Sequence, residues 1–161
     1  SSGAVILISG IAQGDGNSNR DGNSVKLKGG LLRWTASQSG SASYTNLRLM
    51  VVVDTRGQGV APVISDIITP TTVYGLPNVT AQPNRYVILH DQIVTFDALS
   101  RRLAAGAIAL QALEDVHLSF VGTDHLVAST AGATVWLVLV SSEATNAPNV
   151  LGQARVLFLD N

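Results

Sequence analysis

The chain has 161 residues and no cysteine, its formal net charge is −1, and 46% of its residues are hydrophobic while 13% are charged. This length fits one domain, and the lack of cysteine excludes disulfide scaffolds, thiol catalysis and thiolate metal sites. The charged fraction is well below the ~25% of an average soluble domain, which predicts a large core and a surplus of apolar surface. No apolar run approaches the ~18 residues of a membrane span, so we expect no membrane partner.

Strand-like segments recur along the whole chain, separated by clusters of Gly, Asn, Asp, Ser and Pro. The expected strands are residues 4–9, 24–36, 44–54, 84–96, 114–122, 126–129, 133–142 and 153–159. A short proline-led helix is expected at 62–68, and a longer helix at 98–113, where leucines and alanines recur every three to four residues. The order predicts an all-β chain, an eight-stranded jelly-roll sandwich of two antiparallel sheets with short helical insertions, as a single domain over residues 1–161.

The segment 24–36 shows how the faces are expected to alternate. Lys26 and Lys28 occupy the polar phase, and the phase changes across a glycine pair so that Leu32 and Trp34 face inward. A glycine pair within a strand predicts a β-bulge.

Three strands, at 44–54, 133–142 and 153–159, are apolar on both phases. A sandwich buries only one face of each sheet, whereas strands that are apolar on both faces are covered on both. The second cover must come from the helices and long loops or from other subunits. We therefore expect obligate assembly.

No catalytic constellation is found, and we predict that the protein is not an enzyme. His90 and Asp91 resemble an acid/base pair, but adjacent residues of a strand point to opposite faces. His117 is expected at the surface and His125 in a turn, and neither belongs to a ligand cluster.

The loop 10–23 contains Asp15 and Asp21 among glycines and asparagines. Carboxylate and amide oxygens suit a hard cation, so these two residues are weak calcium candidates, with a subunit interface as the expected place for such an ion. The closing Glu of an EF-hand is absent, and turn chemistry explains the same composition. No cofactor is otherwise expected.

Basic residues are scattered, and the chain has no basic excess of the kind that marks a stand-alone nucleic-acid binder. Arg48 and Arg155 nevertheless lie on the polar phase of otherwise apolar strands. If the two strands are neighbours, the guanidinium groups form a small positive patch; otherwise they are solvated charges that keep an edge soluble.

Several motifs, in order, resemble the capsid proteins of small circular single-stranded DNA viruses and of the satellite tobacco necrosis virus group. They are Gly10-Ile11-Ala12-Gln13-Gly14-Asp15 with Arg20 and Gly22, the Arg-led strand Arg48-Leu49-Met50-Val51-Val52-Val53-Asp54, the segment Ala61-Pro62-Val63-Ile64-Ser65-Asp66-Ile67-Ile68, and Asn84-Arg85-Tyr86-Val87-Ile88-Leu89-His90-Asp91. Together they cover roughly the first hundred residues.

This resemblance implies a jelly roll with strands B to I in two sheets, B-I-D-G and C-H-E-F. Assigned by order, residues 4–9 are B, 24–36 are C, and the others follow through 153–159 as I. Arg48 on D and Arg155 on I are then expected to be neighbours in one sheet, and 98–113 is the E–F connection.

The resemblance also implies function. We expect a structural protein of the virion that self-assembles into a small icosahedral T=1 shell of roughly 60 copies around a single-stranded DNA or RNA genome. The genome is expected to contact mainly an arginine-rich arm ahead of residue 1, which this sequence does not contain. Within the chain, the expected nucleic-acid-facing residues are Arg48, Arg155, Lys26 and Lys28.

The alternative from another class is a non-viral jelly-roll binding module, such as a trimeric ligand- or carbohydrate-binding domain. A sugar site requires exposed aromatic side chains, and Trp34 and Trp136 lie on apparent core phases. Tyr44 and Tyr74 are the loop candidates for such a site.

Overall fold

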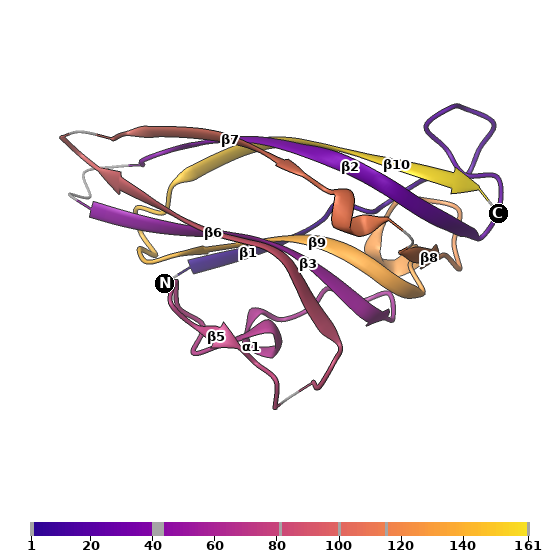
Figure 1. The fold of residues 1–161 in the computed structure, drawn as a ribbon, viewed down its shortest axis with the longest axis horizontal. Coiled ribbons are helices and arrows are strands. Elements are labelled where there is room, and N and C mark those ends of the chain that lie inside the picture. Colours follow the sequence, from indigo (N-terminus) through magenta and orange to yellow (C-terminus); the bar gives the residue numbers. More distant parts are fainter. Residues whose placement is uncertain (1, 40–43, 81, 100, 115, 161) are drawn as a thin grey trace.

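The computed structural model describes residues 2–39, 44–80, 82–99, 101–114 and 116–160. The chain is mostly β and its strands lie in two layers (Figure 1). The lower layer consists, in hydrogen-bonded order, of β1 (Ser2–Leu7), β9 (Gly132–Ser141), β3 (Tyr44–Gly57) and β6 (Tyr86–Asp97). The upper layer consists of β10 (Asn149–Asp160), β2 (Ser24–Ser37) and β7 (Leu103–Ala109), with β2 in the middle.

The short strand β8 (His117–Ser119) joins the two layers. It pairs antiparallel with the start of β2 and makes one parallel bridge, Leu118 to Ala133, with β9. The eight strands therefore form one continuous mixed sheet, where the sequence predicted two separate antiparallel sheets. The difference arises because β8 is only three residues long and lies where it can reach both layers.

The main core fills the space between the layers. Val25, Leu27, Leu32 and Trp34 of β2 point into it and are at most 3% exposed, as the alternation predicts. The bulge expected at the glycine pair is present, because the pairing of β2 with β10 shifts register between Leu157 and Phe158.

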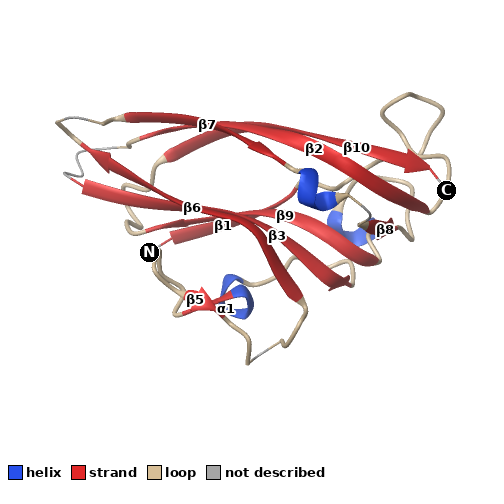
Figure 2. Ribbon diagram, in the orientation of Figure 1, coloured by secondary structure: helices blue, strands red, loops and turns tan. Residues whose placement is uncertain are grey.

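A second core lies below the lower layer. The short helix α1 (Ile64–Ile67) and the small hairpin of β4 (Ile68–Thr69) and β5 (Leu76–Pro77) cover the outer face of β3 and β9 (Figure 2). Met50, Val52, Trp136 and Val138 pack there against Ile67. The prediction that two-faced strands are covered on both sides is confirmed for β3 and β9, and the cover comes from the same chain. It is not met within this chain for the segment 153–159, because Leu157 and Leu159 on the outer face of β10 are exposed. No helix among the described residues is long and apolar enough to span a membrane.

The helix predicted at 98–113 is wrong. Among its described residues, 103–109 form β7, which pairs with residues 31–37 of β2, and a 3₁₀ turn follows at Gln111–Leu113. The burial of β7 alternates with a period of two, with Ala104 and Ile108 inside. Alanine and leucine favour helices locally, but the free edge of β2 offers this segment a ladder of hydrogen bonds, and tertiary pairing overrides the propensity.

Two smaller expectations also fail. The strand predicted at 126–129 is a 3₁₀ turn, η2 (Val127–Ser129), whose Ser129 hydroxyl is hydrogen-bonded to Asp124. The strand predicted at 114–122 shrinks to β8, with residue 115 outside the described residues. Both segments lie at the junction of the two layers, where the described pairing is limited to β8 and to an isolated bridge between Phe120 and Thr130.

The pairings correct the strand assignment that the resemblance implied. The strand at 44–54 was expected beside the strand at 153–159, but β3 lies between β9 and β6, whereas β10 pairs with β2. Arg48 is opposite Ile93 and Val140, and Arg155 is opposite Leu31. The two arginines are therefore in different layers and do not form one patch.

Candidate nucleic-acid interface

Four basic side chains share the outer face of the upper layer. Lys26, Lys28 and Arg33 occupy outward positions of β2, between buried neighbours that face the core, and Arg155 does so on β10. Lys28, Arg33 and Arg155 are exposed and Lys26 is half-buried. Three of these four residues were predicted from the sequence to face nucleic acid; whether they do so remains a prediction.

Arg33 and Arg155 are diagonal neighbours in the sheet. Arg33 lies opposite Gln153, two residues before Arg155 on β10. Diagonal pairs in an antiparallel ladder are ~7–8 Å apart at Cα, within the combined reach of two guanidinium groups. The pair can therefore bind one phosphate together or two successive phosphates of a strand.

The outward positions of β2, β7 and β10 contain no Asp or Glu. The one carboxylate on β10, Asp160, lies at the end of the strand and accepts hydrogen bonds from the backbone N–H groups of Asp21 and Gly22. A face with several cations and no anion on its strands attracts polyanions, even though the whole chain has a net charge of −1.

Arg33 was missed among the candidate residues, although the sequence contains the signal. It lies between Leu32 and Trp34, both predicted to face inward, so the same alternation that assigns Lys26 and Lys28 to the outer face assigns Arg33 to it as well.

Arg48 has a different environment from the other candidates. Its side chain is about 7% exposed and lies on the covered outer face of β3. One edge of the guanidinium group contacts the Asp91 carboxylate, with Nε donating to Oδ1 over 2.8 Å and Nη2 donating to Oδ2, and Nη1 donates to the carbonyls of Val73 and Gly75. All three nitrogens donate hydrogen bonds, and Arg48 fastens the segment between α1 and β6 to the sheet.

Other residues of the family-like motifs also have structural roles. Arg20 is fully buried, donates to the carbonyls of Ile11, Gly22 and Gly122, and lies 4.2 Å from the centre of the Phe120 ring. It ties the loop 10–23 to the rest of the chain.

Asp54 is likewise fully buried and is bonded at 2.9 Å by two nitrogens of Arg85. The hydrogen bond to Asp54 raises the pKa of Arg85 further above its ordinary value, against the opposing effect of burial. This pair closes the end of the β3–β6 ladder.

The calcium candidates are not brought together. Asp15 and Asp21 are both exposed in the loop 10–23. Over the described ranges, no three His, Cys, Asp or Glu side chains gather in a way that could hold a metal. Calcium therefore stays a prediction without a built site to support it.

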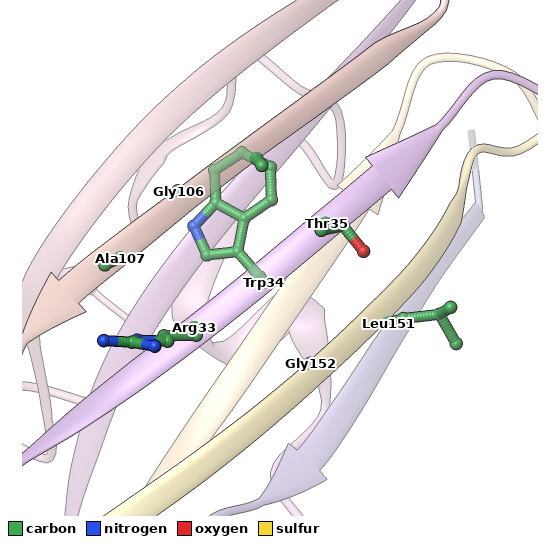
Figure 3. Close-up of a pocket in the computed structure, with 8 residues that line it drawn as sticks. Arg33, Trp34, Thr35, Gly106, Ala107, Leu151 and Gly152 are labelled. Atoms are coloured by element: carbon green, nitrogen blue, oxygen red, sulfur yellow. The ribbon is translucent and has the colours of Figure 1, made fainter.

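Two shallow hollows lie on the same outer face. The first, of about 620 Å³, is lined by Arg33, Trp34, Thr35, Ala105, Gly106, Ala107, Leu151 and Gly152 (Figure 3). The second, of about 400 Å³, is lined by Leu31, Arg33, Gln153, Ala154 and Arg155. Arg33 lies on the boundary between them.

Comparison with known proteins gives two results. The satellite tobacco necrosis virus coat protein family matches residues 1–161. The coat protein of Maize white line mosaic Satellite virus is 27% identical over 152 residues, which are 93% of this chain and 69% of that protein. Both results agree with the satellite-virus part of the resemblance and with the capsid hypothesis, and neither supports the carbohydrate-binding alternative.

Proposed function

Because the chain belongs to the satellite tobacco necrosis virus coat protein family, and is a capsid-forming coat protein of a satellite virion with no enzymatic role, we propose that it builds an icosahedral shell of roughly 60 copies around a single-stranded genome. We further propose that the outer face of the β10–β2–β7 layer faces this genome. The observation that carries this second proposal is the set of four cations, Lys26, Lys28, Arg33 and Arg155, on strands whose outward positions hold no carboxylate.

The opposite surface of the molecule is a weaker candidate. The outer face of β3 and β9 is covered by α1 and the β4–β5 hairpin, and its arginine is bonded to Asp91 and to two carbonyls. Lys28, Arg33 and Arg155 of the upper layer are exposed, and their side chains can contact phosphate without moving a covering segment.

The experiment uses a variant in which Lys28, Arg33 and Arg155 are all replaced by Gln, which removes three positive charges from this face. We expect the nucleic acid per assembled particle, measured from the 260/280 nm absorbance ratio and sedimentation, to fall to roughly half. Binding of a single-stranded oligonucleotide should lose about two units of salt slope, since each lost phosphate contact removes ~0.7.

The matched control replaces Arg56, Arg101 and Arg102, which are exposed outside this face, by Gln. It removes the same charge and should package nearly as the parent does. Equal packaging by both triple variants would contradict the assignment of this face. Purified particles much smaller than a closed shell would contradict the proposal that the protein assembles into an icosahedral shell.

The strand order supports the finer description of the fold as a jelly roll. The order β1-β9-β3-β6 corresponds to C-H-E-F, and β10-β2-β7 corresponds to I-D-G. In this assignment β1 is strand C, and the position of strand B, beside β10, is not occupied by any described residue.

We propose that a coat-protein segment outside residues 1–161 fills this position, and that the expected basic arm precedes that segment. The core is less closed on this side, because Val150, Val156 and Phe158 of β10 face inward but are only half-buried. The 290 Å³ hollow lined by Val150, Pro148 and Gly3 places the start of β1 near the start of β10, where an antiparallel partner of β10 would end. The relative is also longer than the region that it shares with this chain.

A further inference from the structure

The two hollows on the outer face of the upper layer differ in chemistry. The first has a mostly apolar lining, in which Ala105 of β7 faces Leu151 of β10 across Thr35, and Ala107 lies at the next outward position of β7, opposite Arg33. The second is flanked by the guanidinium groups of Arg33 and Arg155 and by the Gln153 amide. The first hollow, which we call the apolar seat, thus lies directly beside a hollow that is lined by two arginines. Arg33 lines both hollows.

The small outward residues of β7 are not required by packing within the chain. On the inner face, Gly106 must lack a side chain, because a Cβ there would lie 2.8 Å from the Trp34 ring (Figure 3). Ala105 and Ala107 point the other way and are exposed, so the fold would accept larger side chains at both positions. Their small size keeps the first hollow open.

We propose that this pair of hollows binds one nucleotide unit of a single-stranded nucleic acid, with the base on the alanine floor and the phosphate at Arg33 and Arg155. This inference rests on the proposed function of the face and adds a preference for single strands to it. In a duplex the bases are stacked and paired, so only the phosphates could reach this surface, whereas an unpaired base can lie flat on an apolar seat. The seat offers Thr35 as its one hydroxyl, so we expect little discrimination among bases.

A nucleotide fits this site better than a purely anionic ligand does, because the arginines account for the second hollow but not for the apolar lining of the first. An acidic peptide or free phosphate would use Arg33 and Arg155 but would gain nothing from the surface formed by Ala105, Ala107 and Leu151. A single-stranded nucleic acid carries a flat base and an anionic phosphate in every unit, so it can contact both hollows.

The test compares the binding of a fluorescent ten-nucleotide single strand with that of a duplex of the same length, at one fixed salt concentration, to the purified coat protein. Ala107→Leu fills the seat without changing charge. We expect its affinity for the single strand to fall about tenfold, because the leucine side chain occupies the space of the base and the apolar contact beneath the base is lost, while its affinity for the duplex stays within about twofold.

Ala109→Leu is the matched control, because Ala109 is also exposed on β7 but lines neither hollow. It should bind both ligands as the parent does. Thermal unfolding verifies that each variant is folded. If Ala107→Leu is not folded, Ala105→Val, which places a β-branched residue at a second outward position of the same seat, takes its place.

The inference is overturned if the parent binds single strand and duplex equally, or if Ala107→Leu and Ala109→Leu have the same single-strand affinity. These outcomes differ from failure of the proposed function, which is tested by the variant with Gln at positions 28, 33 and 155. If the triple Gln variant loses binding to both ligands while Ala107→Leu has no effect, the face still contacts the genome but the base does not bind in the apolar seat.

Discussion

The outer faces of the two layers both carry arginines on otherwise apolar strands, and the two sets have different environments. On β3, Arg48 lies beneath a covering segment and is bonded to Asp91 and to the carbonyls of Val73 and Gly75. On the upper layer, Arg33 and Arg155 lie on an uncovered face whose strands present no outward carboxylate. The strand patterns are similar, but only the upper layer keeps its positive charge available to a polyanion.

The role of an outward arginine therefore depends on whether another segment covers its face of the sheet. A guanidinium group that is removed from water must find acceptors, and Arg48 finds a carboxylate and two carbonyls. An exposed guanidinium group retains its hydration and can exchange it for phosphate. Variants on the two faces test this contrast.

The sharpest test is Arg48→Ala, which leaves the carbonyls of Val73 and Gly75 without their donor and detaches the covering segment. We expect a loss of about 2–3 kcal/mol in the free energy of unfolding, below the ~3–5 kcal/mol of a fully buried pair because the Asp91 side chain is 37% exposed. Urea denaturation measures this loss. Arg155→Ala, the control on the open face, should change stability by less than about 0.5 kcal/mol, and equal losses would refute the contrast.

The two sides of β7 offer a second comparison. Gly106→Ala places a methyl group against the Trp34 ring and should destabilise the protein by about 1–3 kcal/mol through overpacking. Ala107→Ser on the outer side should change stability by less than about 0.5 kcal/mol. A neutral Gly106→Ala variant would show that the inner face of β7 is not tightly packed.

Within the part of the chain that the structure describes, β10 pairs on one side and β2 pairs on both, and hydrogen exchange can compare the two strands. In residues 1–161, we expect the β10 amides that point away from β2 to exchange rapidly, while those of β2 are protected on both sides. In a coat protein that includes the segment proposed for the strand B position, the same β10 amides should exchange at least about tenfold more slowly. Protection that grows with protein concentration instead would identify a second copy as the partner of β10.

The smallest effect is expected at the junction of the layers. The Ser129 hydroxyl, together with the Leu126 N–H, lowers the pKa of Asp124 below its ordinary value. A lowered carboxyl pKa contributes stability above the ordinary value, and this stability is lost as the pH falls through the folded-state pKa. Ser129→Ala should therefore move the pKa of Asp124 upward in a carboxyl NMR titration; an unchanged titration would show that the hydroxyl has no influence.

Much of the architecture could be predicted locally. The alternation in residues 24–36 predicted both the buried face of β2 and its bulge, and the two apolar phases of β3 and β9 predicted that both faces are covered. Lys26, Lys28 and Arg155 followed from the same rule, because a period of two assigns each strand residue to a face without reference to its neighbours.

The failures share one cause. Residues 103–109 pair with β2, and Arg48 meets Asp91 and the carbonyls of Val73 and Gly75, through contacts between segments distant in the sequence. Local propensity favours a helix for residues 103–109, and strand phase alone predicts a solvated side chain for Arg48. No local sequence pattern indicates which strand edge can accept a partner or which face of a sheet is covered.

The β character of this coat protein, the faces of its long strands and the family of its motifs could be predicted without the structure, because they depend on side-chain period and local order. Three features required the folded chain: Arg48 fastens a covering segment, Arg33 lies with Lys26, Lys28 and Arg155 on one open face, and β10 pairs only with β2 among the described residues. The physical reason is that strand partners and covering segments come from distant parts of the chain, and the environment of a charged side chain is set by those partners.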